Sequence, residues 1–314
     1  MVRALPRVAV VVVNFRTPGL VEDCLDALAL DPSVQELDLD VVVLDNGSGD
    51  DSAERLARRG DCRVVALAEN RGFAAGVNAG VAAAHGDPVV VLNSDTRVRP
   101  GAIGALVDAL AAVPAVGLAA PVLEHPDGTP QPNAYRRLPT PLTVASEVAI
   151  APGYLQMLLP RLPIANVVAP GAVAAGASYA WVMGAAFAVS RSWWERVGPF
   201  DEGFFLYFEE TDWQRRLRAL GGRVEVVADA RVEHLLRAGD PLLAVVSPHW
   251  VRSARRYLAR DGVPTRVAAA WLQGALAVAW LTTWTTSARG GEGLERGREM
   301  RRRMRALRRA AVGS

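Results

Sequence analysis

Residues 204–213 hold the densest group of side chains that could do acid–base chemistry. Glu209, Glu210 and Asp212 place three carboxylates within four residues, beside aromatic side chains and at the start of an expected helix. Because carboxylates at a helix start are stabilised by the helix dipole, capping explains part of this pattern. Capping does not uniquely require Glu210, and a carboxylate among aromatic residues can act as a general base. We therefore predict Glu210 as the catalytic residue.

The same expected helix contains two oppositely charged residues whose spacing has a structural explanation. Asp212 and Arg216 are four residues apart, so they can form an ion pair along the helix surface. The helix is expected to stop at the two glycines 221–222. The residues that we expect to support this site or to position an acceptor are Glu209, Asp212, Trp181 and Arg216.

Four short apolar runs are the elements that must position the polar residues. They occupy residues 8–15, 41–44, 64–67 and 89–92. Helical stretches at 20–30 and 74–84 lie between them, and short apolar strands that alternate with helices predict a mostly parallel α/β sheet covered on both faces. In such sheets ligands bind at the carboxyl ends of the strands.

Polar residues follow each of these runs. Asn14, Asp45, Asn70 and the segment 93–95 all fall just after a predicted strand. Asp95 is well placed to hold a hard divalent cation, Mg²⁺ or Mn²⁺, which would neutralise a diphosphate. The alternative is that Asp95, like the tetrapeptide 45–48, only forms a turn.

Residues 69–76 lead from a strand end into a helix. The backbone amides after Gly72, together with Asn70 and Arg71, could therefore face a phosphate. The alternative role of the glycines is close packing of the helix on the sheet. The segment matches neither a Walker motif nor a dinucleotide-binding glycine fingerprint, which disfavours an ATPase or a dehydrogenase.

Composition bounds the remaining possibilities. The chain has 314 residues, about half of them hydrophobic, and a formal net charge of +2. That near balance disfavours a protein whose whole surface binds nucleic acid. Cys24 and Cys62 are too few for a disulfide framework or a structural zinc site and suit a reducing compartment. The first apolar run is too short for the core of a signal peptide, so we expect a cytoplasmic protein.

The composition changes along the chain, and this change predicts a catalytic domain followed by a separate C-terminal segment. Residues 1–240 are expected to form the catalytic domain, with 121–180 as an irregular excursion that touches an acceptor or a membrane. Residues 241–314 are expected to be helical, with an apolar stretch at 267–286 and a basic tail at 296–309. Trp271, Trp280 and Trp284 suit a helix lying on an anionic membrane surface, whereas packing on the catalytic domain is the alternative.

Several motifs in a fixed order carry a family resemblance. They are Val-Val-Asn-Phe at 12–15, Leu-Asp-Asn-Gly-Ser at 44–48, Glu-Asn-Arg-Gly-Phe-Ala-Ala-Gly-Val-Asn at 69–78, Leu-Asn-Ser-Asp-Thr at 92–96, Gly-Ala-Ala-Phe-Ala-Val at 184–189, and Gly-Pro-Phe-Asp-Glu-Gly-Phe-Phe-Leu-Tyr-Phe-Glu-Glu-Thr-Asp-Trp at 198–213. Together they resemble the inverting family 2 glycosyltransferases, above all the rhamnosyltransferase-like branch. The resemblance runs from about residue 8 to residue 234 and implies a GT-A fold.

The resemblance also implies roles for single residues. Asp45 would contact the nucleotide base or ribose, and Glu210 would be the catalytic base. Asn93 to Asp95 would occupy the metal-binding D-x-D position, and His234 would add a metal or diphosphate contact. Two residues depart from the family pattern, since Asn93 replaces the first Asp and Glu210 stands where many relatives carry Asp.

The function implied is transfer of a sugar, with inversion, from a nucleotide-sugar donor to a lipid-linked saccharide acceptor in cell-surface polysaccharide synthesis. The first donor to consider is dTDP-rhamnose, with UDP-galactofuranose as an alternative. The enzyme would act peripherally at the inner face of the cell membrane. Two other classes stay open: a nucleotidyltransferase-type α/β enzyme and a non-catalytic membrane-associated binding module.

Overall fold

The computed structural model describes residues 5–131, 134–136, 138–141, 143–144, 181–235, 247–260, 262–264 and 266–274. These residues form two compact units. The larger unit contains the described residues up to 136, together with 181–205 and 209–235. The smaller unit contains the described residues of 138–144, the segment Leu206–Phe208 and the described residues from 247 to 274.

An eight-stranded sheet forms the centre of the larger unit, with the strand order β3-β2-β1-β4-β9-β6-β10-β5. The strands are β1 (Arg7–Asn14), β2 (Asp38–Asp45), β3 (Arg63–Ala66), β4 (Val89–Asn93), β5 (Thr96–Val98), β6 (Val116–Glu124), β9 (Ala186–Val189) and β10 (Arg223–His234). A separate two-stranded sheet pairs β7 (Tyr135–Arg136) with β8 (Trp181–Val182).

The sheet is mostly parallel, as the sequence predicts. Strand β1 pairs in parallel with β2 and β4, β2 with β3, and β6 with β10. Strand β9 runs antiparallel between β4 and β6, and β5 runs antiparallel along β10. Strand β1 is buried from Val8 to Asn14, and its run of valines suits a central strand that is covered on both faces.

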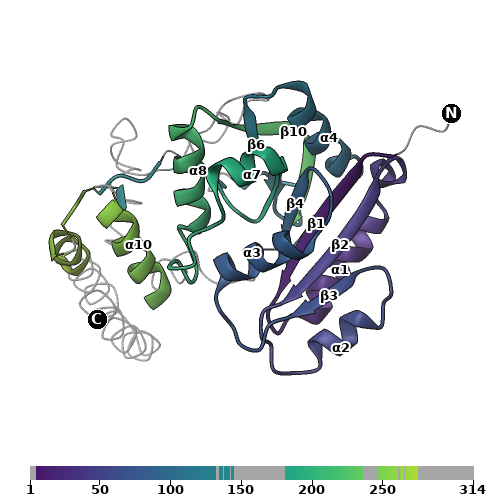
Figure 1. The fold of residues 1–314 in the computed structure, drawn as a ribbon, viewed down its shortest axis with the longest axis horizontal. Helices are drawn as coiled ribbons and strands as arrows, with labels where there is room; N and C mark the ends of the chain where they lie inside the picture. The colour runs from purple at the N-terminus through teal and green to yellow at the C-terminus, as the bar shows by residue number, and fades with distance from the viewer. Residues whose placement is uncertain are drawn as a thin grey trace. The chain divides into compact units, whose positions relative to one another are not determined.

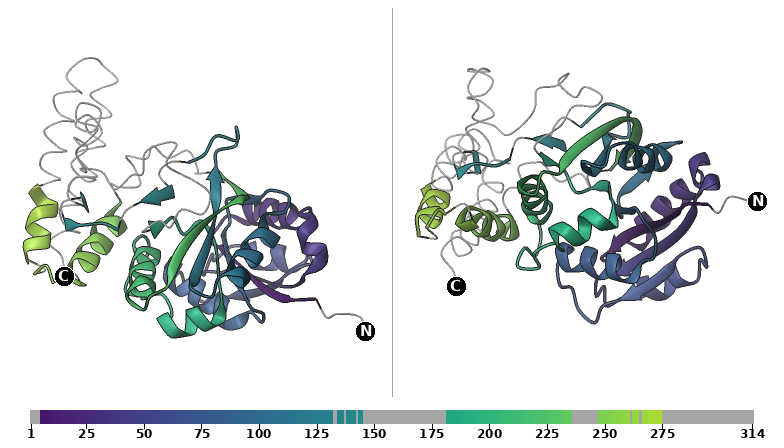
Figure 2. Two further views of the ribbon diagram at one scale, coloured as in Figure 1. Left: turned by 90° about the horizontal axis from the view of Figure 1, so that it is seen from above. Right: turned by 45° about the horizontal axis from the view of Figure 1, so that its top comes forward.

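Helices pack against this sheet (Figure 1), and Figure 2 shows them from two further directions on both of its faces. Helix α1 contacts β1 and β5, α3 contacts β1 and β2, and α4 contacts β6 and β10. The helical elements of the larger unit are α1 (Pro18–Ala29), η1 (Pro32–Glu36), α2 (Ser52–Ala57), α3 (Phe73–Ala83), α4 (Ala102–Ala112), α7 (Arg191–Val197) and α8 (Glu209–Ala219). The predicted helices at 20–30 and 74–84 thus correspond to α1 and α3.

Aromatic packing fixes helix α8 in the larger unit. The ring of Trp213 is fully buried and stacks on Trp194 of α7 with 5.7 Å between the ring centroids. The indole nitrogen of Trp213 also donates to the carbonyl of Gly198 over 2.8 Å. Helix α8 therefore begins at a place set by the core, and its first residues are Glu209 and Glu210.

Two expectations about the less regular parts of the chain can be compared with the structure. The irregular excursion is expected to begin at residue 121, but β6 continues to Glu124, where it still pairs with β10 after a shift in register. Residues 145–180, most of that excursion, lie outside the described residues. In the smaller unit, α10 spans Pro248–Arg260 and residues 266–274 are helical, whereas 275–314 lie outside the described residues. Among the helices described, none has the length and apolar character needed to cross a bilayer.

Candidate active site

The carboxyl ends of β1, β2 and β4 bring three predicted donor-binding residues to one edge of the sheet. In the parallel register, Asn14 lies opposite Asp45, and Val13 lies opposite Asn93. The Asp45 carboxylate accepts hydrogen bonds from the Asn14 amide over 2.6 Å and from the Ser48 hydroxyl over 2.5 Å. Its second oxygen accepts from the Ser48 backbone amide over 3.1 Å. Asp45 is thus a rigid acceptor that remains 4% exposed.

A hydrogen-bond chain connects this carboxylate to the end of β4. The Asn14 side-chain oxygen accepts from the amide and the hydroxyl of Thr17, each over 3.2 Å. The Thr17 hydroxyl in turn lies 3.1 Å from that of Ser94. The turn 93–95 is therefore held in place relative to Asp45 by polar contacts as well as by the sheet.

The structure brings Asp95 and His234 together, although they lie 139 positions apart in the sequence. Strand β5 pairs with β10 so that Thr96 lies opposite His234, and the Leu235 amide donates to the Asp95 carbonyl over 2.9 Å. The imidazole Nε2 of His234 lies 3.5 Å from a carboxylate oxygen of Asp95. A carboxylate and an imidazole at this separation can act as ligands to the same cation.

Gln131 orients the imidazole of His234. Its amide nitrogen donates to the carbonyl of His234 over 2.7 Å and lies 3.2 Å from the carbonyl of Glu124. Because carbonyls only accept, the amide oxygen of Gln131 must face His234 Nδ1, which lies 3.1 Å away. Nδ1 is then the donor and Nε2 is directed to Asp95. Sequence reasoning missed Gln131, because it lies in the stretch interpreted as irregular.

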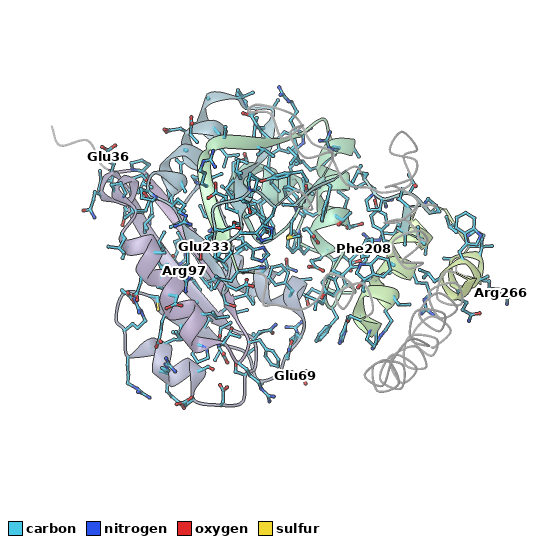
Figure 3. The ribbon with its side chains drawn as sticks, turned by 180° about the vertical axis from the view of Figure 1, so that it is seen from behind. Glu36, Glu69, Arg97, Phe208, Glu233 and Arg266 are labelled. Atoms are coloured by element: carbon cyan, nitrogen blue, oxygen red, sulfur yellow. The ribbon has the colours of Figure 1, made fainter. Side chains whose placement is uncertain are left out.

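Ion pairs fix the strand that carries His234. The Glu233 carboxylate contacts Arg97 over 3.0 Å and Arg99 over 2.9 Å, and its side chain is only 8% exposed. Arg97 and Glu233 can be seen side by side in Figure 3. The residue before His234 is therefore tied to β5, the strand that follows Asp95.

The side chain of Asn93 has a buried oxygen atom that could accept a ligand. Its amide oxygen is buried and has no hydrogen-bond partner among the described residues. Its backbone amide donates to Ala185 of the loop before β9 over 2.8 Å. In the described part of the chain no three His, Cys, Asp or Glu side chains converge on a common point. The available donors, oxygen atoms and one imidazole, suit Mg²⁺ or Mn²⁺ when phosphate oxygens complete the coordination.

The loop of residues 70–73 is anchored to the turn that follows β2. The Asn70 side chain accepts from the Gly72 amide over 2.9 Å. The Asn46 side chain donates to the Gly72 carbonyl over 2.9 Å and accepts from the Arg71 amide over 3.2 Å. Asn46 was noted only as part of a turn, and its role in holding this loop comes from the structure.

The other side of that loop contacts the segment before α8. The Phe73 amide, expected to be available to a phosphate, donates to the Phe205 carbonyl over 2.7 Å. A Cβ on Gly72, which has φ +89°, would lie 2.3 Å from the same carbonyl oxygen, so only glycine fits there. The Arg71 guanidinium pairs with Glu202 over 2.7 Å. The loop therefore links the donor edge of the sheet to the acidic motif.

The two glutamates at the start of α8 have different surroundings. Glu209 is 3% exposed, and one of its carboxylate oxygens has no hydrogen-bond partner among the described residues. Burial, and then the charge of Glu210, raises the pKa of Glu209 well above its usual value. Glu210 is only partly buried. Of the two residues, Glu210 is therefore the more exposed, although one of its carboxylate oxygens, Oε2, is buried.

Gly184 places Glu210 beside the sheet edge. A Cβ on Gly184 would lie 3.1 Å from both Cβ and Cγ of Glu210, so the glutamate side chain crosses directly over this glycine. The next residue, Ala185, accepts the hydrogen bond of the Asn93 amide. Glu210 thus borders the end of β4. The motif at 184–189 contained Gly184, but no feature of the sequence showed that it would contact Glu210.

The predicted supporting residues hold α8 and β8 in place. Asp212 is fully buried and accepts from Arg216 over 3.0 Å, while Arg216 also donates to the carbonyl of Val197 over 2.6 Å. Gln214 makes two hydrogen bonds to the backbone of Val182, next to the buried Trp181. These contacts describe a packing role for Asp212 and Arg216, and Gln214 is a further supporting residue that the sequence did not indicate.

This arrangement of sheet, helices and acidic edge is the GT-A architecture of glycosyltransferases. A crystal structure of GalNAc-T7 with UDP, GalNAc and Mn²⁺ has a TM-score of 0.57 and 16% identity, and the match covers 84% of this chain and 52% of that one. The mannosyltransferase PcManGT from Pyrobaculum calidifontis, in complex with GDP-Man and Mn²⁺, has a TM-score of 0.55 and 20% identity over 99% and 87% of the two chains. Residues 1–349 of S. aureus TarS have a TM-score of 0.51 and 14% identity over 98% and 81%.

The particular family follows from the sequence comparisons. The model of glycosyl transferase family 2 matches residues 9–174. The N-acetylglucosaminyl-diphospho-decaprenol L-rhamnosyltransferase of Mycobacterium tuberculosis is 30% identical over 242 residues, which are 72% of this chain and 75% of that relative. The chain belongs to glycosyl transferase family 2 and is a glycosyltransferase. The predicted family, fold and enzyme class are therefore confirmed.

Proposed function

We propose that this glycosyltransferase moves rhamnose from dTDP-rhamnose, with inversion, to N-acetylglucosamine on a lipid-linked diphosphate. The observation that carries the proposal is the partly exposed Glu210, which lies over Gly184 beside the sheet edge that also holds Asp45 and Asp95. The name of the mycobacterial relative supports both the rhamnose donor and the lipid-linked acceptor. UDP-galactofuranose is the alternative donor.

Donor binding is assigned to the edge formed by β1, β2 and β4. Asp45 is pre-positioned by Asn14 and Ser48, and it accepts a hydrogen bond from the base or ribose of the donor. Asp95 and His234 would hold a divalent cation, which supplies charge compensation for the diphosphate. The Mn²⁺ in the structures of two glycosyltransferases of similar fold supports this choice of cation.

Glu210 acts as the general base in a single displacement. Its carboxylate takes the proton from an acceptor hydroxyl as that oxygen attacks the anomeric carbon of the donor sugar. The bond from the anomeric carbon to the diphosphate oxygen breaks in the same step, and the nucleoside diphosphate leaves with the electron pair. Because attack and departure occur on opposite faces, the configuration inverts. The neighbouring Glu209 is buried, and its burial raises its pKa above the usual value.

The acceptor places the enzyme at a membrane surface, peripherally on the cytoplasmic side. The helical residues 266–274 support this proposal, because Val267 and Trp271 are 40% and 45% exposed. Large apolar side chains exposed on a helix suit the membrane interface. Trp280, Trp284 and the basic tail 296–309, which were expected to contribute, lie outside the described residues.

A donor screen tests the proposed reaction. We expect the protein to transfer sugar to a synthetic polyprenyl-diphosphate-N-acetylglucosamine in the presence of Mn²⁺ when the donor is dTDP-rhamnose. Mass spectrometry of the product gives the added mass, and NMR of the new linkage gives its configuration. Transfer from UDP-galactofuranose alone would replace the donor, and a product of retained configuration would overturn the single displacement.

A second prediction concerns the residue that orients His234. Replacing Gln131 by leucine removes the acceptor for Nδ1, so the imidazole loses its fixed tautomer and direction. Loss of such a supporting hydrogen bond typically weakens metal binding about 10- to 100-fold. We expect Gln131→Leu to weaken Mn²⁺ binding by that factor in calorimetric titrations of the protein with dTDP present. Asp127→Ala, at an exposed turn close to Gln131 in the sequence, is the control and should keep the wild-type affinity; equal affinity in all three proteins would contradict this role.

A further inference from the structure

One side of helix α10 (Pro248–Arg260) carries a concentration of positive charge. Arg252, Arg256 and Arg260 are exposed, and Arg255 is partly exposed. The first three have the spacing i, i+4 and i+8, which places them in line along the helix. The sequence of α10 contains no Asp or Glu. These four arginines, which we call the arginine face, are therefore not neutralised by an acid of their own helix.

The other side of α10 is already covered within the smaller unit. The rings of Trp250 and Tyr257 are buried, and the centroid of each lies 5.3 Å from that of Phe208. The buried Ser253 hydroxyl donates to the carbonyl of Leu206 over 2.9 Å. The segment that carries Leu206 and Phe208 belongs to the same compact unit as α10. The helix therefore presents its arginines and has no apolar side left to insert into a bilayer.

The next helical stretch of the same unit, residues 266–274, exposes side chains of a different kind. Val267 and Trp271 are exposed and four residues apart, so they adjoin on one side of the helix. Arg266, which is labelled in Figure 3, is exposed next to Val267. Arginine binds anionic head groups, and tryptophan prefers the boundary between head groups and acyl chains. The two stretches together suit the surface layer of an anionic bilayer.

We propose that the arginine face of α10 is a docking surface for the anionic phospholipid head groups of a bilayer. The inference rests on the proposed action at a membrane surface, and it names the lipid chemistry that this surface takes. The arginines attract the head-group phosphates, and Val267 and Trp271 add an apolar contact. Because α10 contributes charge and no apolar insertion, its share of the binding depends on anionic lipid and weakens with salt.

Sedimentation of the whole chain with lipid vesicles tests this surface. The double variant Arg252→Ala/Arg256→Ala is compared with Arg58→Ala/Arg223→Ala, which removes the same charge from exposed positions of the larger unit. The vesicles contain equal parts of phosphatidylglycerol and phosphatidylcholine. Since each basic side chain near an anionic surface contributes a factor of about five to binding, the α10 variant should bind about 25-fold more weakly than the wild type. The control variant should bind like the wild type.

Two further measurements check that charge is the cause. Replacing Arg252 and Arg256 by lysine keeps the charge and should retain most of the binding. At about 1 M salt, where the Debye length is only about 3 Å, the wild type and the alanine variant should bind equally weakly. Equal binding of the wild type and a folded alanine variant at low salt would overturn the proposal. Wild-type binding that is as tight on phosphatidylcholine alone as on the anionic vesicles would also overturn it, whether or not the alanine variant folds.

A last comparison distinguishes head groups from the diphosphate of the acceptor. At equal surface charge, vesicles with synthetic polyprenyl-diphosphate-N-acetylglucosamine should bind the wild type no better than vesicles with phosphatidylglycerol. Tighter, arginine-dependent binding to the acceptor would show that the arginines recognise its diphosphate, and the proposal would be wrong. Vesicle binding requires no sugar transfer. A wild type that transfers no sugar but binds through its arginines would contradict the proposed function alone, whereas transfer without arginine-dependent binding would contradict this inference alone.

Discussion

Glu210→Gln is expected to fold normally, to bind the donor nucleotide with near-normal affinity and to lose most sugar transfer. Glutamine keeps the size of the side chain and its hydrogen bonding but cannot accept a proton at neutral pH. Losing a positioned general base typically lowers the rate by about 10² to 10⁴, whereas losing a capping carboxylate costs only about 1 kcal/mol of stability. The ratio of kcat between mutant and wild type, measured with saturating donor, therefore separates catalysis from capping.

Glu209→Gln is the matched control. Because burial raises the pKa of Glu209, glutamine replaces a carboxyl group whose charged form is disfavoured, and more activity should remain. A carboxyl group with a raised pKa in the folded protein contributes stability below its unfolded pKa, and this contribution falls as pH rises through the folded value. In Glu209→Gln, the free energy of unfolding measured by urea titration should therefore decrease less with rising pH, above about pH 5, than it does in the wild type. Near-normal transfer by Glu210→Gln, with an inactive Glu209→Gln or Asp212→Asn, would move the base to the other carboxylate.

The strands and the donor edge were predictable because their signals are local. Continuous runs of β-branched residues identify β1, β2 and β4, and a parallel register then aligns their carboxyl ends. This register alone predicts that Asn14, Asp45 and Asn93 lie close together, and no knowledge of side-chain packing is needed. The antiparallel strand β9 has no such signal, because its four buried residues resemble those of a parallel strand.

The contacts that complete the candidate site join residues far apart in the sequence. Gln131 and His234 are separated by 103 positions, and Asn78, which binds the backbone of Phe200, by 122. No periodic pattern marks such pairs, since each depends on how separate elements meet in the folded sheet. The difference between Glu209 and Glu210 has the same origin: adjacent, identical side chains acquire different burial only when α8 packs on the core.

The first backbone amide of α3 is not available in the way that the local sequence predicts. A glycine before a helix predicts amides that are open to phosphate, but the Phe73 amide is taken by the carbonyl of Phe205. Only the fold brings that carbonyl to Gly72, across more than 130 residues of chain. As a result, the loop of residues 70–73 holds the acidic motif next to the donor edge, and we propose that a cation held by Asp95 and His234 compensates the charge of the diphosphate.

Asp95→Ala is expected to abolish most of the metal response of donor binding and of transfer. Asp95 is the carboxylate of the 93–95 turn, and it lies 3.5 Å from the imidazole Nε2 of His234. Its loss leaves the imidazole of His234 and the amide oxygen of Asn93, neither of which supplies an anionic oxygen ligand to a cation. We expect the Mn²⁺ concentration for half-maximal rate to rise at least about 100-fold, because even supporting residues of metal ligands contribute 10- to 100-fold.

The measurement that isolates this effect is the thermal shift produced by dTDP with and without Mn²⁺, because a ligand that binds only the folded state raises Tm by mass action. The wild type should show an extra shift with Mn²⁺, and Asp95→Ala should show the shift of dTDP alone. His234→Ala should behave in the same way, and the double variant should add little, since ligands of one ion are strongly coupled. Asp127→Ala, at an exposed turn, is the control for a general loss of charge. An unchanged Mn²⁺ response in Asp95→Ala would show that the cation binds elsewhere, and the assignment of this edge to the diphosphate would then be wrong.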